Sequence, residues 1–261
     1  MPSPTDQCLR KRALVLGLHG LLTRWDELSH EPWLSTLLDI EETERQRRSL
    51  ERRLAAAKLT MMKPIADFDW KHPKTIDRTL VDDLFELQFM RDHVNIVLLG
   101  PNGVGKTMLA QNLAYHAVMH GFTARFTTAS AMLGDLNAQD GAVALRRRLH
   151  RYVKPALLVI DELGYLPYSN RYADLLFEVV TQRYMKAPIV ITTNRPFSEW
   201  AAVFQSATCV GTLLDRLCHR VEIVQIAGES WRLKESMERS ARPPRNPAPR
   251  SRPRGSESRA P

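Results

Sequence analysis

Few cysteines and no long apolar segment limit what this chain can be. Its three cysteines, Cys8, Cys209 and Cys218, show neither metal-ligand spacing nor an even-numbered disulfide framework. We therefore expect reduced, buried thiols, as is usual in the cytoplasm. No apolar stretch approaches the roughly 18–20 residues of a membrane-spanning helix, so no membrane partner is predicted. The apolar stretch 13–22 is interrupted by His19 and lacks a small-residue cleavage site, which argues against a secretory signal.

The chain also has little net charge outside its C-terminal end. The whole sequence carries a formal net charge of +8. Residues 239–261 contain seven arginines and one glutamate and so contribute +6, which leaves +2 for the other 238 residues. This tail is rich in proline, arginine and serine and almost free of apolar residues, so we predict that residues 239–261 are disordered. The near-neutral remainder gives only weak support for nucleic-acid binding by the folded part.

The residues before this tail divide into segments of different pattern. Residues 1–60 show apolar side chains at helical spacing, and Glu31-Pro32 suits a helix start because proline is tolerated in a first turn. This pattern predicts a small helical N-terminal domain. Residues 61–92 contain several prolines and then a helical pattern over residues 79–90, so we expect a linker followed by a lead-in helix.

The charged middle of the N-terminal segment has two interpretations. Five arginines stand among acidic residues on one predicted helix: Arg45, Arg47, Arg48, Arg52 and Arg53. A solvated helix face explains them as well as contact with nucleic-acid phosphate groups does.

Residues 93–238 alternate between apolar, mostly β-branched segments and helical patterns. The strand candidates are residues 94–99, 124–128, 156–160, 189–193 and 221–226. Strands that alternate with helices form parallel sheets that are covered on both faces. We therefore predict an α/β fold with a five-stranded parallel sheet flanked by helices.

A glycine-rich sequence directly follows the first predicted strand. It reads Gly100-Pro101-Asn102-Gly103-Val104-Gly105-Lys106-Thr107, and Met108 continues into a predicted helix. Glycines let such a loop wrap so that backbone N–H groups point at a phosphate, and the helix N-terminus adds positive potential. Lys106 would then bridge the β- and γ-phosphate oxygens, and the Thr107 hydroxyl would bind Mg²⁺. The sequence therefore predicts a P-loop nucleotide site.

The strand predicted at residues 156–160 ends in two carboxylates. Asp161 at its tip can complete the Mg²⁺ shell opposite Thr107, and Glu162 can polarise the attacking water. A strand that ends in Asp-Glu is unspecific by itself. Behind a phosphate loop, the pair favours nucleotide hydrolysis.

Asn194 follows the strand predicted at residues 189–193. Its amide can hold the attacking water or contact the γ-phosphate, or it can cap the turn before Pro196. If this strand lies between the phosphate-loop strand and the Asp-Glu strand, the chain is of the ATPase type that has an extra strand and a catalytic glutamate. The sequence lacks an Asn-Lys-x-Asp guanine-binding motif, so ATP is favoured over GTP.

Two later arginines have no single interpretation from the residues alone. Arg216 lies in a helical pattern, and Arg232 follows Gly228 by four residues. Each is either a solvated side chain or a group that neutralises charge on a transferring phosphate, which some proteins supply from a neighbouring subunit.

Several motifs occur in an order that resembles one protein family. They are the loop Gly100–Thr107, Ile160-Asp-Glu-Leu-Gly-Tyr-Leu-Pro, Leu176-Phe-Glu-Val-Val-Thr-Gln-Arg-Tyr, Ile191-Thr-Thr-Asn-Arg-Pro-Phe-Ser-Glu-Trp, Leu214-Asp-Arg-Leu and Gly228-Glu-Ser-Trp-Arg-Leu-Lys. This ordered set closely resembles the IstB-like transposition ATPases, the helper proteins of insertion-sequence transposons, which are related to DnaC-like helicase loaders. The resemblance covers residues 10–238.

The resemblance implies a AAA+ ATPase domain over residues 93–238 and a DNA- or partner-binding domain over residues 1–60. It implies a cytoplasmic homo-oligomer that assembles with ATP on duplex DNA, selects or remodels target DNA and recruits a partner transposase, with hydrolysis driving release. It also implies that Arg216 acts across a subunit interface and that Arg232 is a second sensor of the bound nucleotide.

Two alternatives share parts of this interpretation. A DnaC-like replicative helicase loader would use the same chemistry, but the Gly-Glu-Ser-Trp-Arg-Leu motif favours the transposition family. A catalytically inactive, nucleotide-responsive scaffold is the third possibility, and the intact set of polar site residues argues against it. That set comprises Lys106, Thr107, Asp161, Glu162 and Asn194.

Overall fold

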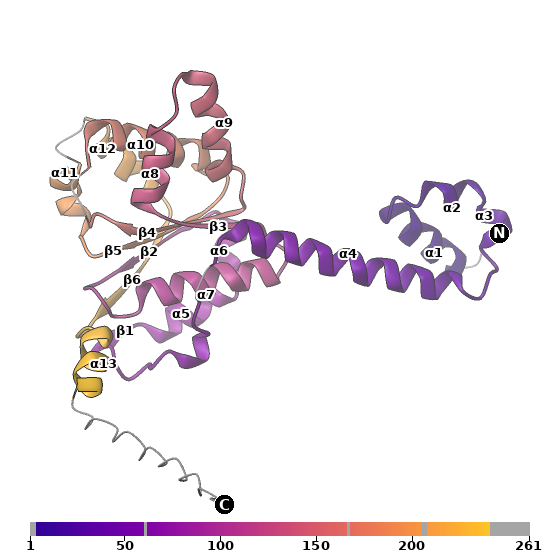
Figure 1. Cartoon of the computed structure of the whole chain (residues 1–261), viewed down its shortest axis with the longest axis horizontal. Helices are drawn as coiled ribbons and strands as arrows, with labels where there is room; N and C mark the ends of the chain where they lie inside the picture. Colours follow the sequence, from indigo (N-terminus) through magenta and orange to yellow (C-terminus); the bar gives the residue numbers. More distant parts are fainter. Residues whose placement is uncertain (1–3, 60–61, 166–167, 205–207, 241–261) are drawn as a thin grey trace, which may run out of the picture.

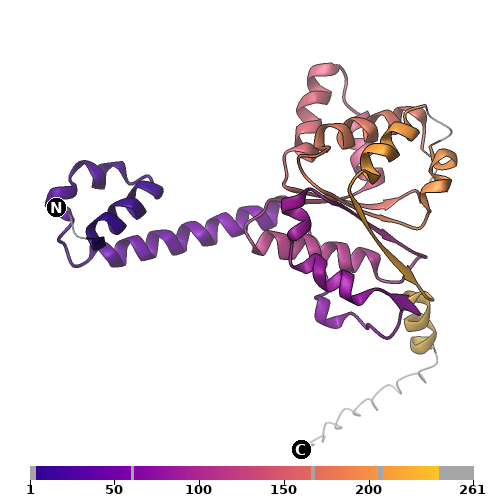
Figure 2. The ribbon, with the colours of Figure 1, turned by 180° about the vertical axis from the view of Figure 1, so that it is seen from behind.

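A layered α/β body and a separate helical head make up the chain, as seen in a computed structural model (Figure 1). The structure describes residues 4–59, 62–165, 168–204 and 208–240. One long helix joins the head to the body, and the view from behind shows the same separation (Figure 2). The disorder predicted for residues 239–261 falls almost wholly outside the described residues.

The body is built on one six-stranded sheet with the order β1-β6-β2-β5-β4-β3. Its strands are β1 Thr75–Ile76, β2 Asn95–Leu99, β3 Ala124–Thr128, β4 Leu157–Leu163, β5 Ile189–Thr193 and β6 Val221–Ala227. Strands β2 to β6 pair in parallel, which confirms the predicted parallel sheet. Strand β5 lies between β2 and β4, as expected for an ATPase with an extra strand. The antiparallel β1 is an addition that is too short to show a periodic pattern.

Helices cover both faces of the sheet, as Figure 1 shows. One layer contains α5 Arg78–Phe85, α6 Gln88–Asp92 and α7 Lys106–Met119. The other contains α8 Ala129–Asn137, α9 Ala142–Val153, α10 Asn170–Arg183, α11 Trp200–Val203 and α12 Val210–Cys218. Neighbouring residues of β2 point to opposite layers, because Ile96 and Leu98 pack with the first layer and Val97 with the second.

Short elements complete the body. They are the 3₁₀ turns η1 Ile65–Asp67 and η2 Phe197–Glu199 and the C-terminal helix α13 Trp231–Ser240. Two predicted boundaries were wrong. The lead-in helix is broken at Leu87, whose φ of 58° is left-handed, and β4 continues past residue 160. Asp77 caps α5 by accepting a hydrogen bond from the Leu80 amide at 2.9 Å.

One buried arginine stabilises the end of the sheet that lies opposite the phosphate loop. Arg183, at the end of α10, is 1% exposed. Its guanidinium donates hydrogen bonds to the backbone carbonyls of Tyr152, Val153, Pro155, Ala156 and Pro188. Burial lowers its pKa to about 10. These bonds join the end of α9 to the start of β4 and of β5, so Arg183 has a structural role.

The head is a small helical unit with its own apolar core. It comprises α1 Pro4–Val15, α2 His19–Thr23, α3 Trp25–Leu28 and the start of α4 Leu34–Ala57. The buried residues of this core are Ala13, Leu16, Trp25, Leu34 and Leu38. The far end of α4 packs on the body through the buried Ala57. The structure therefore confirms the predicted helical N-terminal unit.

The arginines of α4 are mostly paired within the helix. Arg45 pairs with Glu41, Arg47 with Glu44 and Glu51, and Arg48 with Glu44. Arg53 donates to the Ser49 hydroxyl and to the Val118 carbonyl. This arrangement favours the solvated-face interpretation.

Two expectations from composition have different outcomes. No helix within the described ranges is long and apolar enough to cross a membrane. The expectation of buried thiols is wrong for Cys8, which is exposed on α1, whereas Cys209 and Cys218 are partly buried.

Candidate nucleotide-binding site

The phosphate loop leaves the carboxyl end of β2 and enters α7 at Lys106. Gly103 and Gly105 have left-handed φ values of 82° and 100°. Close neighbours also exclude side chains here, because a Cβ on Gly103 would lie 2.1 Å from the Ser230 Oγ and one on Gly105 2.4 Å from the Phe68 ring. Only glycine fits at these two positions, and the resulting backbone can wrap with its N–H groups toward a phosphate at the start of α7.

Lys106 is held against the loop that precedes it. The side chain is 4% exposed, and its Nζ donates to the Gly100 and Pro101 carbonyls at 2.7 Å each. Burial, together with the positive charge of Arg232, lowers the pKa of this ammonium to about 8, although Asp161 and Glu162 oppose the shift. Phosphate oxygens can replace the two carbonyls as partners and would stabilise the charged form.

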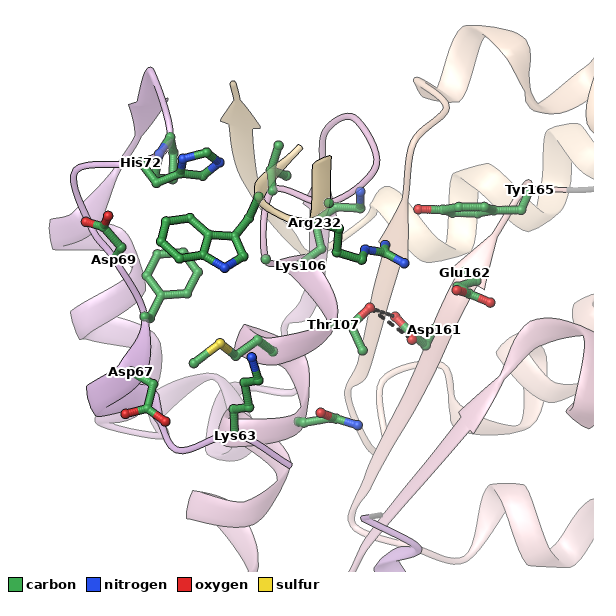
Figure 3. Close-up of a pocket in the computed structure, with 18 residues that line it drawn as sticks. Lys63, Asp67, Asp69, His72, Lys106, Thr107, Asp161, Glu162, Tyr165 and Arg232 are labelled. Carbon is green, nitrogen blue, oxygen red and sulfur yellow. Dashed lines mark hydrogen bonds between the residues drawn. The ribbon is translucent and has the colours of Figure 1, made fainter. Parts of the chain in front are cut away.

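Thr107 and Asp161 meet directly across the cavity (Figure 3). The Thr107 hydroxyl lies 3.0 and 3.1 Å from the two carboxylate oxygens of Asp161, which is only 3% exposed. A hydroxyl and a carboxylate that converge in this way are the hard oxygen ligands that Mg²⁺ prefers. The two side chains therefore fit the predicted role in holding Mg²⁺ beside a bound nucleotide.

Glu162 follows Asp161 on β4 and also lines the cavity. Its side chain is exposed, and its φ of 60° is left-handed, which is unusual for a residue with a side chain. Figure 3 shows Glu162 and Tyr165 on the same side of the cavity as Asp161. Burial raises the pKa of the Tyr165 phenol, and the two carboxylates raise it further.

The cavity has a volume of about 450 Å³, within the usual range for a small-molecule site. One wall comes from the segment that the sequence predicted to be a linker. The residues of this wall are Lys63, Asp67, Phe68, Asp69, His72 and Pro73. Sequence reasoning missed their place at the site. The one sequence feature that could have pointed to this wall is the aromatic Phe68-Asp-Trp motif. Its residue types and their spacing alone do not assign it a function.

The C-terminal segment closes the cavity beside this wall. The backbone amide of Trp231 donates a hydrogen bond to the Gly103 carbonyl at 3.0 Å. The Trp231 indole packs edge-on against the His72 ring, with the ring centroids 4.8 Å apart. The His72 Nε2 lies 2.9 Å from the Glu229 carbonyl. Arg232 projects into the cavity, where its charge acts on Lys106. The pairing of β1 with β6 thus brings two distant segments to one nucleotide site.

Five predicted site residues are absent from the described lining of the cavity: Gly100, Pro101 and Asn102 at the start of the phosphate loop, and Asn194 and Arg216. Asn194 follows β5, and its side-chain Oδ1 is buried without a hydrogen-bond partner among the described residues. Arg216 is on α12, where it donates to the Thr181 hydroxyl and lies 4.9 Å from the centre of the Phe177 ring. The structure therefore brings together Lys106, Thr107, Asp161, Glu162 and Arg232 but leaves Asn194 and Arg216 outside their own cavity.

A phosphate loop between β2 and α7, an Asp-Glu pair on β4 and an inserted β5 define a P-loop ATP-binding protein of the AAA+ type. The family described as IstB-like ATP binding protein matches residues 13–239. The chain therefore belongs to the IstB-like ATP-binding protein family.

Curated relatives support this assignment. A protein named as ATP-binding in insertion sequence IS5376 of Geobacillus stearothermophilus is 36% identical over 80% of this chain and 83% of its own length. Its counterpart in IS21 of Pseudomonas aeruginosa is 36% identical over 80% of this chain and 79% of its own length. Among solved structures, DnaI matches with a TM-score of 0.54 and 18% identity, over 65% of this chain and 93% of DnaI, which shows a shared fold.

Proposed function

We propose that this chain hydrolyses ATP and is a transposition helper whose ATP-bound form assembles on duplex DNA. The observation that supports hydrolysis most strongly is the convergence of Lys106, Thr107, Asp161 and Glu162 on one cavity. The curated relatives named for insertion sequences support the biological setting. A helicase loader would share the chemistry, but these relatives favour transposition.

In the proposed reaction, water attacks the γ-phosphorus of ATP, and the bond between this phosphorus and the β–γ bridging oxygen breaks to give ADP and phosphate. Glu162 polarises the water and accepts its proton, and Lys106 neutralises negative charge on the β- and γ-phosphate oxygens. Thr107 and Asp161 would hold Mg²⁺, which would supply positive charge to the phosphate groups. Arg232, which comes from the C-terminal segment, acts as the second sensor of the bound nucleotide.

Arg216 has a proposed role in a neighbouring subunit. It lies outside its own cavity and is only half-buried, with its guanidinium against Phe177 on the surface formed by α10 and α12. An arginine that completes the site of the next subunit makes hydrolysis depend on assembly. Asn194 is proposed to hold the attacking water once nucleotide and neighbour are in place.

Duplex DNA and a partner transposase are the proposed macromolecular partners, in the cytoplasm. The near-neutral folded part predicts weak DNA binding by one subunit, and assembly would multiply weak phosphate contacts into strong, salt-dependent binding. ATP would then control residence on target DNA, with hydrolysis allowing release after the transposase has been recruited.

The central test is the variant Glu162→Gln. We expect ATP turnover to fall by about 100-fold or more while nucleotide binding remains, because the amide cannot accept the proton of water. Steady-state phosphate release and binding of a fluorescent ATP analogue measure the two properties. Glu222→Gln, at an exposed position on β6, is the matched control and should behave as the parent. Turnover by Glu162→Gln at the parental rate would show that the assignment of the base is wrong.

Assembly has its own test. Electron microscopy of the chain with an ATP analogue and duplex DNA should show rings or spirals, and dispersed monomers would contradict the assembly proposal. Arg216→Ala and Glu162→Gln subunits should each be inactive alone but should recover part of the turnover when mixed. Such mixing creates interfaces with one intact glutamate and one intact arginine. A mixture that stays inactive would overturn the role of Arg216 across the interface.

A further inference from the structure

The pairing of β4 with β5 contains an irregularity at the catalytic carboxylates. Ile160 pairs with Ile191, and Leu163 pairs with Thr193. Two residues of β4, Asp161 and Glu162, therefore stand opposite a single residue of β5. This is a β-bulge, which is rare between parallel strands and is often found beside active sites, where it redirects a side chain.

The single opposing residue, Thr192, makes hydrogen bonds to both residues of the bulge. Its side chain is buried, with 1% of the residue exposed. Its Oγ1 accepts a hydrogen bond from the Glu162 amide at 2.9 Å. The same hydroxyl donates to the Oδ1 of Asp161 at 2.5 Å. One hydroxyl thus satisfies the backbone of the proposed base and the carboxylate of the proposed Mg²⁺ ligand.

The bulge allows two adjacent carboxylates to line the same cavity. In a regular strand, successive side chains point to opposite faces of the sheet, so Asp161 and Glu162 would diverge. Here both line one cavity, and Glu162 takes a left-handed φ of 60° in doing so. Residues rarely occupy this region unless their surroundings hold them there. The bond to the Thr192 hydroxyl is the contact at the Glu162 amide that does so.

We infer that Thr192 is a positioning residue for ATP hydrolysis. Its hydroxyl fixes the bulge that directs Glu162 to the γ-phosphate, and it keeps Asp161 turned toward Thr107. Thr192 does not line the cavity and acts through the two carboxylates. The inference rests on the proposed ATP hydrolysis. It adds Thr192, which lies outside the lining of the cavity, to the residues that support this reaction.

Three substitutions separate positioning from general damage to the sheet. Thr192→Val keeps the shape and burial of the side chain but removes both hydrogen bonds. Thr192→Ser keeps the hydroxyl. Thr193→Val is the matched control, because Thr193 is the next residue of β5 and is also buried, at 0% exposed. The Thr193 hydroxyl bonds to the backbone of Arg195 and to neither carboxylate.

We expect Thr192→Val to lower kcat for ATP by about tenfold to hundredfold, because small displacements of catalytic groups have effects of this size. The affinity for ATP in the presence of a magnesium chelator should stay within about threefold, because the loop and Lys106 are unchanged. Thr192→Ser and Thr193→Val should retain kcat within about threefold of the parent. A parental kcat for Thr192→Val, or equal loss of kcat in Thr192→Val and Thr192→Ser, would overturn the inference.

Two further measurements keep the test independent of folding and of the proposed function. In the parent without nucleotide, the Glu162 amide should exchange its hydrogen slowly although its side chain is exposed, and rapid exchange would contradict the bond to Thr192. Thermal unfolding of Thr192→Val and Thr193→Val should occur at similar temperatures, and a selective collapse of Thr192→Val would point to a purely structural role. If the parent itself fails to hydrolyse ATP, the proposed function fails, whereas the exchange measurement still decides whether Thr192 holds the bulge.

Discussion

Charged groups in the nucleotide cavity and on α4 have altered pKa values for different reasons. Burial lowers the pKa of Lys106 to about 8, whereas hydrogen bonds from Arg47 and Arg48 lower that of Glu44 to about 2 on an exposed helix. In the cavity, Lys106 and Asp161 are buried and have few partners, so the loss of one partner leaves another group buried and unpaired. On α4, the ion pairs are exposed to water, so each contributes little.

The head at the other end of α4 depends on apolar packing instead. Its core is a small cluster of buried side chains, including Trp25, Leu34 and Leu38, and its ion pairs lie at the surface. The surface pair of Arg12 with Glu42, at 2.8 Å, is one example. We therefore expect a single polar substitution to have a large effect in the cavity and a single apolar truncation to have a large effect in the head.

The largest effect should come from Lys106→Ala. Truncating one partner of a buried, hydrogen-bonded charge pair costs about 3–4 kcal/mol, which corresponds to an affinity loss of several hundredfold. Titration with a fluorescent ATP analogue measures this loss. Lys63→Ala is the control from the same cavity, because Lys63 lines it outside the phosphate loop. Equal losses in both variants would show that the buried lysine is not special.

The next largest effect should follow Leu38→Ala in the head. Leu38 is 0% exposed, and such truncations cost about 3 kcal/mol, or roughly a hundredfold in the local unfolding equilibrium. Hydrogen exchange over α1–α3 should become faster, while affinity for nucleotide stays unchanged. Leu37→Ala is the matched control, because its side chain on the adjacent face is already 38% exposed and should lose little. A parallel loss of nucleotide affinity would show that head and cavity are coupled.

A smaller effect concerns pH and the lysine of the cavity. Its pKa falls from the ordinary 10.5 to about 8, so the free protein loses this proton as pH rises through 8. Bound phosphate favours the charged form, so binding above pH 8 must take up a proton and becomes weaker. We expect affinity for ATP to fall about tenfold between pH 7 and pH 9. Calorimetry in buffers of different ionisation enthalpy should detect proton uptake near pH 8.5, and a flat profile would contradict the shift.

The same contrast explains what the sequence could predict about the site. Lys106, Thr107, Asp161 and Glu162 are close to strand ends, and parallel strands bring their carboxyl ends to one edge, so local motifs were sufficient. The wall formed by His72 and its neighbours was not predictable in this way, because it is placed by the pairing of β1 with β6, whose partners lie about 150 residues apart in the chain.

The fold shows the same limit. The five long strands were predicted from apolar, mostly β-branched segments, whereas β1 has two residues and no such segment. The break at Leu87 was missed because leucine rarely adopts a left-handed backbone, and no glycine or proline beside it signals the end of a helix. The extension of β4 through Glu162 was missed because it requires the hydrogen bond that the Glu162 amide donates to the opposing Thr192, which is a tertiary contact.

The smallest effect should come from Arg47→Ala on α4, and it tests whether this helix is only a solvated face. Arg47 pairs with Glu44 and Glu51 and has a side chain that is 56% exposed. Because exposed pairs contribute little, thermal unfolding and nucleotide affinity should stay within experimental error of the parent. The slope of log DNA affinity against log salt concentration, measured with an ATP analogue, should also be unchanged. If that slope falls by about one, Arg47 contacts a DNA phosphate. Single charged residues would then matter for function on α4 as well as in the cavity.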